Sequence, residues 1–458
     1  MRHMLLAAAT LIAATLPGLA LAQTAAPGAQ AAVDARARAL EPKLLAWRRD
    51  IHQHPELGNR ETRTAKLVAD HLRKLGFEVH TGVAGTGVVG VLKGGRPGST
   101  VALRADMDAL PVEEKNDLPF RSRATGTYEG KTVPVMHACG HDAHVAMLMT
   151  TAELLAGMKA ELPGTVKFIF QPAEEGPSDF TPDGKRFWGA RLMVAEGVMR
   201  AGRFGPKVDA VFGLHVFANV PAGRIAWRPG PTLASSDLLK ITVEGRQTHG
   251  ARPWGGIDPI VVGSQIVLGL QTIASRQVEV TKEPSIITIG QFNGGVRNNI
   301  IPDQVVLTGT VRAFDEGMQA DIHQRIKRTA ENIAESAGAK ATVEIVRQYP
   351  VTINSADLAA RMEPTLKRVA GDKDQAGAGW AINDKVTGAE DFSFFDREAP
   401  GLFLILGVTP PDQMATAASN HSPQFMVHEP ALLQGVRVMS NLTLDYLSGA
   451  QQTRQAAR

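Results

Sequence analysis

Residues 165–175 read Thr-Val-Lys-Phe-Ile-Phe-Gln-Pro-Ala-Glu-Glu, an apolar run that leads into two adjacent carboxylates. Its β-branched and aromatic side chains favour a buried strand, and its proline favours a turn after that strand. The pattern recurs, because strands predicted at 100–104 and 210–214 lead into Asp106 and His215. In open α/β sheets, binding sites gather beyond the carboxyl ends of the strands. We therefore expect a polar site at one edge of such a sheet.

Predicted helices alternate with these strands. Residues 61–75 and 143–159 each place apolar side chains on one helical face, and further strands are predicted at 77–83 and 87–92. Strands that alternate with helices indicate an α/β fold. We therefore expect a doubly wound, mostly parallel sheet with helices on both faces.

Residues 233–346 show a second pattern, which indicates a small domain inserted into the first. Strand and helix signals occur there in the order β-α-β-β-α-β, the split unit of ferredoxin-like α+β folds. These elements are predicted at residues 238–244, 259–275, 285–292, 304–313, 318–337 and 342–347. The main domain would then comprise residues 34–232 and 347–450, and a strand at 402–406 would return to its sheet.

Length and charge exclude some classes of protein. The chain has 458 residues, more than one hydrophobic core usually serves, which also favours two domains. Its 49 Lys and Arg residues nearly balance 46 Asp and Glu residues, for a net charge of +3. This balance, without a basic stripe, argues against nucleic acid or a membrane surface as a partner.

The first 22 residues have the pattern of a secretory signal. Arg2 precedes an apolar run at residues 5–16 and the small-residue cleavage site Ala20-Leu21-Ala22. A membrane anchor is the alternative, but the apolar run is short and Pro17-Gly18 interrupts it. We expect export to the periplasm or the medium, cleavage near Ala22, and then a disordered Ala/Gln/Pro-rich leader at residues 23–33.

Residues 137–144, His-Ala-Cys-Gly-His-Asp-Ala-His, are the densest group of potential metal ligands. Thiolate and imidazole are preferred ligands of Zn²⁺ and similar ions. Cys139 and His141 lie just before the helix at 143–159, whose N-terminus favours a thiolate. The simpler interpretation is that polar residues cap this helix and Cys139, the one cysteine, fills the core. Three histidines and an aspartate in this short segment favour the metal site.

Four further side chains are candidates, and each also has a structural explanation. Glu174 and Glu175 could serve as general base and metal ligand, or they could form a solvated acidic turn. His215 could be a core histidine with its hydrogen bonds satisfied, and His421 could be a surface histidine. Five side chains suit two metals with a bridging ligand better than one closed tetrahedral site. They are Cys139, His141, Glu175, His215 and His421.

Nine motifs together resemble the amidohydrolase branch of the aminoacylase and carboxypeptidase G-like metallopeptidases, which includes hippurate hydrolases and plant auxin-conjugate hydrolases. The motifs are RRDIHQHPE at 48–56, LRADMDALP at 103–111, HACGHD at 137–142, QPAEEG at 171–176, GLH at 213–215, TH at 248–249, NIIP at 299–302, GAEDF at 388–392 and NH at 420–421. Such an ordered set is specific for the branch, although not for a substrate.

The resemblance implies two divalent ions per subunit, bridged by Cys139 where the wider superfamily uses an aspartate. The remaining ligands would be His141, Glu175, His215 and His421. Glu174 would be the general base. Asp106 stands where the superfamily has a metal-binding histidine, so we expect Asp106 or Asp108 to orient a ligand instead. Zn²⁺, Mn²⁺, Co²⁺ and Ni²⁺ all suit this set of ligands.

The resemblance also assigns roles to the inserted domain. It implies a dimerisation or lid domain whose His249 reaches the neighbouring subunit and stabilises the tetrahedral oxyanion. Asn299 and Arg297 could bind the substrate carboxylate, although an arginine in a turn is usually just solvated. Residues 125–135 and 177–189 look longer than is usual in the family and could reshape the acyl pocket.

The implied activity is hydrolysis of the amide bond of small N-acyl amino acids, with an aromatic acyl group, in a homodimer or higher oligomer. A metal-dependent dipeptidase or carboxypeptidase acting on unblocked peptides is the alternative on the same fold. A thiol hydrolase with Cys139 as nucleophile would need no metal. A metal-dependent binding protein is least favoured, because Glu174 and the candidate ligands are all present.

Overall fold

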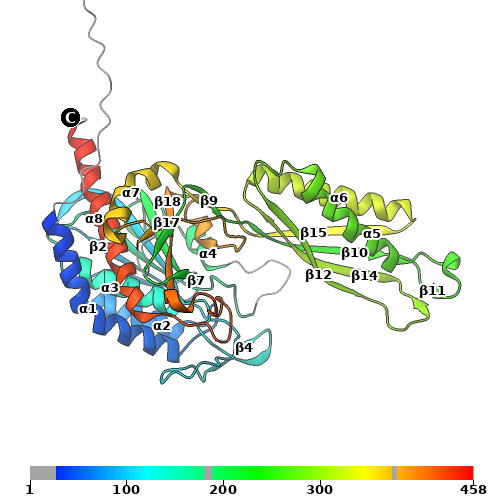
Figure 1. Cartoon of the computed structure of the whole chain (residues 1–458), viewed down its shortest axis with the longest axis horizontal. Coiled ribbons are helices and arrows are strands. Elements are labelled where there is room, and N and C mark those ends of the chain that lie inside the picture. Colours follow the sequence, from blue (N-terminus) through cyan, green and yellow to red (C-terminus); the bar gives the residue numbers. More distant parts are fainter. Residues whose placement is uncertain (1–26, 180–187, 374–378, 457–458) are drawn as a thin grey trace, which may run out of the picture.

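The computed structural model describes residues 27–179, 188–373 and 379–456, which form two domains arranged end to end (Figure 1). The larger domain is built on an eight-stranded sheet, and the smaller domain has a four-stranded sheet with two helices. The predicted signal sequence at residues 1–22 lies outside the described residues. Within the described ranges, we find no helix whose length and apolar character would let it cross a bilayer.

The main sheet has the strand order β1-β2-β6-β3-β7-β18-β8-β17. Its four central strands, β6, β3, β7 and β18, run parallel to one another. At one edge, β2 runs antiparallel to β6, and β1 runs antiparallel to β2. β6 is buried along its whole length, as expected for a parallel strand covered on both faces. The strands are β1 (Glu78–Val83), β2 (Gly87–Lys93), β3 (Arg96–Asp106), β6 (Pro163–Gln171), β7 (Ala210–Pro221), β8 (Ile225–Trp227), β17 (Trp380–Ile382) and β18 (Gly401–Thr409).

Helices and loops cover both faces of this sheet (Figure 1). The helix α3 packs against β3 and β7 and also against α1 and α8, within the larger hydrophobic core. A second core, which includes Met193, Phe204 and Phe403, fills the opposite face. The expected doubly wound α/β fold is confirmed. The helices are α1 (Pro27–Gln53), α2 (Thr62–Lys74), α3 (His141–Ala156), α4 (Gly189–Ala195), α7 (Ala356–Ala370) and α8 (Leu432–Ala456).

The second domain follows the predicted order β-α-β-β-α-β along the chain. Its antiparallel sheet has the strand order β12-β14-β10-β15, and α5 and α6 cover one face (Figure 1). The chain enters and leaves this domain at one place, because β9 (Gly230–Leu233) pairs with β16 (Thr352–Asn354). The elements are β10 (Ser236–Glu244), α5 (Pro259–Thr272), β12 (Ser285–Gly294), β14 (Gln304–Ala313), α6 (Glu316–Ser336) and β15 (Lys340–Tyr349).

Short elements complete the two domains. β4 (Thr125–Tyr128) and β5 (Lys131–Pro134) form a hairpin at the lower edge of Figure 1, within the stretch 125–135. β11 (Thr248–His249) pairs with β13 (Ile300–Ile301) at the far end of the second domain. Much of the other long stretch, 177–189, falls outside the described residues. The remaining helical turns are η1 (Pro253–Gly255), η2 (Ile273–Gln277), η3 (Asp391–Phe394), η4 (Pro411–Gln413) and η5 (Glu429–Ala431).

Two expectations from the sequence were wrong. Residues 27–33 of the expected disordered leader are helical, because α1 starts at Pro27 and buries Val33 completely in the larger core. His215 does not follow a strand but lies within β7, which continues to Pro221. The strand is longer than predicted because β18 pairs with it on both sides of His215, through Leu214 and Val216.

Candidate active site

The candidate ligands gather beside the ends of the central parallel strands. β3 ends at Asp106, and β6 ends at Gln171, just before Glu174 and Glu175. Cys139 precedes α3, which begins at His141. His215 comes from β7, and His421 comes from the loop between β18 and α8. Five segments that are distant in sequence thus meet at one place, as the strand pattern predicted.

Cys139 lies in the middle of this group. Its Sγ is 3.4 Å from Nε2 of His215 and 3.2 Å from Nε2 of His421. The same His421 nitrogen is 2.8 Å from Oε1 of Glu175. Nδ1 of His215 is 2.8 Å from the carbonyl oxygen of Val216 and can donate a hydrogen bond to it. The lone pair of Nε2 is then available to a metal ion. A sulfur between two such groups of nitrogen and oxygen donors suits a bridging ligand.

His141 is fully buried beside two carboxylates. Its Nδ1 is 3.3 Å from Oδ1 of Asp108, and its Nε2 is 3.7 Å from Oδ2 of Asp106. Among the described residues, neither ring nitrogen of His141 has a hydrogen-bond partner of good geometry. A buried imidazole usually has one, so these unsatisfied nitrogens fit a metal ligand. The donor set of one sulfur, imidazole nitrogens and a carboxylate is likewise of the type that binds Zn²⁺ or Mn²⁺.

His144 is part of the same group of side chains but has no free nitrogen. Its Nδ1 lies 2.5 Å from Oδ1 of Asp106, and its Nε2 accepts a hydrogen bond from the backbone N–H of Val216. It therefore connects α3 to β3 and β7. Its spacing of three residues from His141 was visible in the sequence, but only the structure shows that both nitrogens are occupied.

Glu174 is almost fully buried, against a group of charged side chains most of which received no role from the sequence. Oxygen atoms of Glu174, Glu390 and Asp391 lie within 4.8 Å of one another. The guanidinium of Arg104 pairs with Asp106, Glu390 and Asp391 at 2.8–3.0 Å. Asp391 and Glu390 belong to the motif at residues 388–392, which was the available signal for them.

The charge distribution shifts the pKa values of this site. Burial and the charges of Glu390 and Glu175 raise the pKa of Glu174 well above its usual value. Burial and the charges of Glu175 and Glu174 raise the pKa of the Cys139 thiol. Burial disfavours a charged His141, but Asp106 and Asp108 outweigh it and raise the pKa of His141 to about 10. So many carboxylates around a buried histidine make the site favourable for cations.

The three candidate residues of the second domain are not part of this group. His249 is exposed on β11, and the strand lies at the end of the domain that is remote from the main sheet (Figure 1). The backbone N–H of Gly250 donates to the carbonyl oxygen of Asn299, so His249 and Asn299 lie close together. Arg297 is exposed in the preceding turn.

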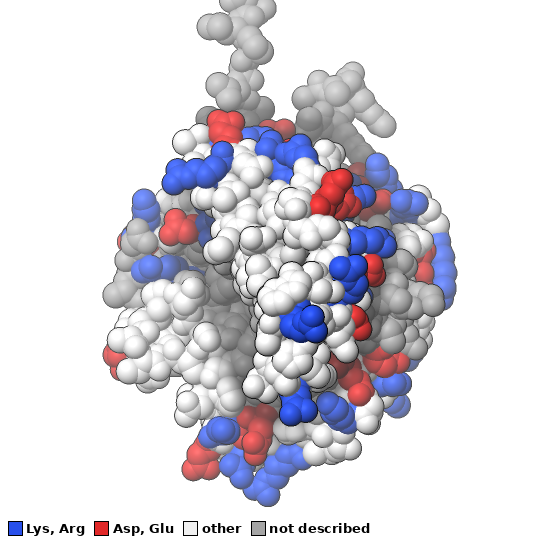
Figure 2. Space-filling view, turned by 90° about the vertical axis from the view of Figure 1, so that its right-hand side faces the viewer, with Lys and Arg blue, Asp and Glu red and all other residues white. Residues whose placement is uncertain are grey.

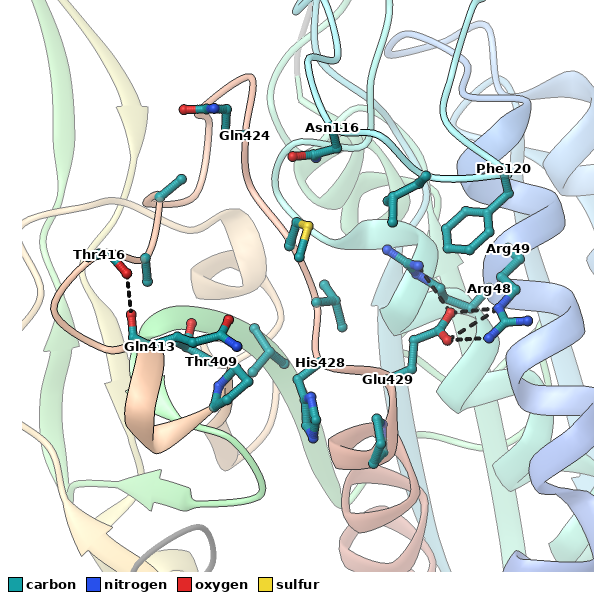
Figure 3. A pocket seen from close by; sticks show the side chains of 18 of the residues that line it. Arg48, Arg49, Asn116, Phe120, Thr409, Gln413, Thr416, Gln424, His428 and Glu429 are labelled. Carbon is teal, nitrogen blue, oxygen red and sulfur yellow. Dashed lines mark hydrogen bonds and ion pairs between the residues drawn. The ribbon is translucent and has the colours of Figure 1, made fainter.

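A pocket of about 740 Å³ opens elsewhere on the main domain, between the loop after β18 and residues 116–120 (Figure 3). Arg48 and Arg49 from α1 both bond Glu429 at its edge, and both guanidinium groups lie about 5 Å from the ring of Phe120. None of the predicted site residues is among the described residues that line it.

Known proteins resemble this chain over most of its length. The chain matches peptidase family M20/M25/M40 over residues 102–445. It is 39% identical over 409 residues to thermostable carboxypeptidase 2 of Saccharolobus solfataricus, covering 89% of this chain and 96% of that relative. It is 36% identical over 417 residues to IAA-amino acid hydrolase ILR1-like 2 of Arabidopsis thaliana, covering 89% of this chain and 87% of that one.

A solved structure agrees with these relatives. It is the crystal structure of the YXEP protein of Bacillus subtilis, described as a dinuclear metal-binding peptidase of family M20, with a TM-score of 0.72 and 31% identity. The match covers 90% of this chain and 99% of that one. The resemblance inferred from the motifs is therefore confirmed: the chain belongs to peptidase family M20 and is a metal-dependent amidohydrolase or peptidase.

Proposed function

We propose that this enzyme hydrolyses the amide bond of small N-acyl amino acids, with a preference for aromatic acyl groups. The observation that carries the proposal is the position of Glu174 beside the group formed by Cys139, His141, Glu175, His215 and His421. The relative from Arabidopsis, named an IAA-amino acid hydrolase, supports the substrate class.

Two divalent ions per subunit, Mn²⁺ or Zn²⁺, would be held by these five side chains, and Co²⁺ or Ni²⁺ would also suit them. Cys139 would contribute a thiolate to this set, since its sulfur lies between His215 and His421. When bound, the ions would activate the attacking water and polarise the scissile carbonyl. Asp108, 3.3 Å from Nδ1 of His141, would orient that imidazole.

Glu174 would move the proton. Its carboxylate would take a proton from the attacking water and then deliver it to the leaving amine. Burial and neighbouring carboxylates raise the pKa of Glu174, which favours the protonated form that must deliver the proton to the amine. His249 of a neighbouring subunit would donate to the oxyanion, with Asn299 and Arg297 near the substrate carboxylate.

The second domain supports assembly as a homodimer or higher oligomer. Apolar side chains of Val261 and Leu268 on α5 are more than half exposed, and β12 is an edge strand. Figure 2 looks at this end of the molecule and shows a broad area without Lys, Arg, Asp or Glu, although a few Lys and Arg side chains lie within the face. Exposed apolar side chains beside an unpaired strand edge support contact with a second copy of the chain.

A carboxypeptidase or dipeptidase acting on unblocked peptides is the second candidate, supported by the relative from Saccharolobus, named a carboxypeptidase. Chelator-stripped enzyme, restored with one metal at a time, should be assayed on benzoylated and acetylated amino acids and on the matching free dipeptides. Higher kcat/KM on the acylated amino acids is expected. Higher kcat/KM on free dipeptides would favour the second candidate. Full activity without metal would favour a thiol hydrolase.

Replacing Glu174 by Gln should lower kcat by roughly 10²–10⁴-fold while leaving bound metal unchanged, because only the proton transfer is lost. Metal content per subunit and steady-state kinetics measure both effects. Glu398→Gln is the matched control, since Glu398 pairs with Arg200 on the surface. A Glu174→Gln enzyme that kept its full kcat would remove Glu174 from the proposed role.

The N-terminal pattern supports export, with cleavage near Ala22 and residence in the periplasm or the medium. Sequencing the N-terminus of the secreted protein should give Gln23 as the first residue. An intact Met1 in the active enzyme would contradict this proposal.

A further inference from the structure

The turn that carries Glu174 and Glu175 is held by three successive backbone amides. The N–H of Ala173 donates to Oε1 of Glu61 at 2.8 Å. The N–H groups of Glu174 and Glu175 donate to the two carboxylate oxygens of Asp108 at 3.0 and 2.9 Å. Two buried carboxylates from different segments thus hold one three-residue turn, which we call the 173–175 turn.

This turn needs such support because its backbone is strained. Ala173 has φ = +46°, in the left-handed region that residues with a Cβ atom rarely adopt. A conformation of this kind costs about 1–3 kcal/mol and persists only where surrounding groups determine it. The carboxylates of Glu61 and Asp108 are the groups that fix the amides on either side of the strained bond.

Glu61 is fully buried and far from the turn in sequence. Besides Ala173, it accepts hydrogen bonds from the N–H of Asn59 and from the hydroxyl of Thr86. The backbone before it packs directly against the turn, since a Cβ atom on Gly58 would lie 2.1 Å from the carbonyl oxygen of Gly176. The segment from Gly58 to Glu61 therefore supports the turn from behind.

We propose that Glu61 is a positioning residue for the hydrolysis, which together with Asp108 holds the 173–175 turn and so places the carboxylates of Glu174 and Glu175. Among the described residues, Glu61 forms no hydrogen bond or ion pair with a candidate ligand, and it acts through the backbone of Ala173. The structural part of this inference is independent of the proposed function, and only its kinetic test rests on that function.

The environment of Glu61 suggests a discriminating substitution. Burial and the charge of Asp108 raise the pKa of Glu61 to about 8, so its carboxyl is largely protonated at pH 7. In that form Oε1 accepts from both amides, and the O–H on Oε2 can donate to the hydroxyl oxygen of Thr86, which reverses the hydrogen bond that an ionised carboxylate accepts. A glutamine reproduces this pattern with its carbonyl oxygen and its NH₂ group. Alanine removes it.

The test compares Glu61→Ala with Glu61→Gln at pH 7, using the metal-loaded enzyme. Glu61→Ala should lower kcat about 10- to 100-fold with little change in KM, because a displaced base slows the chemical step more than binding. Glu61→Gln should recover most of that loss. Hydrogen exchange of the peptide that contains residues 173–175 should be faster in Glu61→Ala only.

Glu56→Ala is the matched control, because Glu56 accepts from the amides of Arg63 and Thr64 at the start of α2. It should lower thermal stability without changing kcat. Equal kcat in Glu61→Ala and wild type, or equal losses in Glu61→Ala and Glu61→Gln, would overturn the proposal. If the wild type cleaves no N-acyl amino acid, the proposed function fails, and hydrogen exchange alone still decides the role of Glu61.

Discussion

The second ring nitrogen decides what each buried histidine of this site can do. His215 and His144 are both buried, and both bond the backbone of Val216. His215 uses only Nδ1 and so can offer Nε2 to a metal, whereas His144 uses both nitrogens. In the sequence, both are histidines beside apolar segments, and nothing there shows which ring nitrogens are hydrogen-bonded. The sequence therefore could not separate a candidate ligand from a structural histidine.

Glu429 is a single residue whose ionisation should make the stability of the fold depend on pH. Burial would raise the pKa of Glu429, but the hydrogen bond from Arg49 and the charge of Arg48 outweigh it and hold that pKa below its usual 4.5 (Figure 3). A group with a lowered pKa in the folded state contributes stability above its unfolded pKa and loses it as pH falls through the folded value. The contribution should therefore be complete at pH 7 and disappear below pH 4.5.

Glu429→Gln should lower the free energy of unfolding at pH 7 by about 1 kcal/mol, the low end for charged hydrogen bonds because solvent screens the half-exposed Arg49. Urea unfolding of both proteins between pH 7 and pH 3 measures the difference. It should shrink as pH falls below the usual pKa of Glu429. A difference that is constant over this range would contradict the assignment, and Glu398→Gln provides the surface control.

At the scale of elements, the start of α3 sets the spacing between Cys139 and His141. Gly140 is the residue before the helix, with φ = +94°, a conformation that glycine adopts without strain. A Cβ atom there would lie 2.3 Å from Cγ2 of Val216 on β7. The turn into the helix therefore requires glycine for its conformation and for its close contact with the sheet.

Gly140→Ala should lower stability by about 2 kcal/mol or more, from backbone strain and overpacking together, and should also reduce bound metal. Thermal unfolding and metal analysis per subunit measure the two effects. Gly157→Ala at the other end of α3 is the matched control, since Gly157 is helical (φ = −67°) and the one close contact of a Cβ atom there would be with the flexible end of the Arg36 side chain. A Gly140→Ala protein with normal stability and normal metal content would show that this turn is not restrictive.

The bounds of helices and strands were predicted best where the spacing of apolar residues in the sequence matched the buried face of the element. The strand at 304–313 has the predicted bounds, and the helix at 61–75 differs by one residue at each end. The long helices α1, α7 and α8 were not predicted, although Leu432, Val436 and Met439 give α8 a regular apolar face. Helices in proteins are stabilised mainly by tertiary packing, here on the sheet and on one another, which local sequence does not reveal.

At the scale of the whole molecule, the proposed site spans two subunits. Glu174 and the candidate ligands belong to the main domain, whereas His249 lies on β11 at the remote end of the second domain (Figure 1). If a partner subunit supplies His249, each site of a symmetric dimer needs an intact Glu174 from one chain and an intact His249 from the other.

Mixing inactive Glu174→Gln and His249→Ala subunits should therefore restore activity. Each mixed dimer has one intact site, so random reassembly should give about a quarter of the wild-type activity per subunit. Reversible dissociation, remixing and a kinetic assay measure this recovery. Mixtures that stay as inactive as the separate variants would place His249 within its own subunit or outside the reaction.

The sequence by itself determined the α/β sheet, the order of elements in the inserted domain, and the segments that meet at the candidate site. Each of these depends on local composition and period, such as the apolar run before Glu174 and the cluster around Cys139. Only the tertiary structure decided which nitrogen of each histidine is free, that Arg104 joins Asp106 to Asp391, and that Glu61 holds the turn at Ala173. These contacts connect residues up to 287 positions apart, and the distance between such atoms depends on how the whole chain packs.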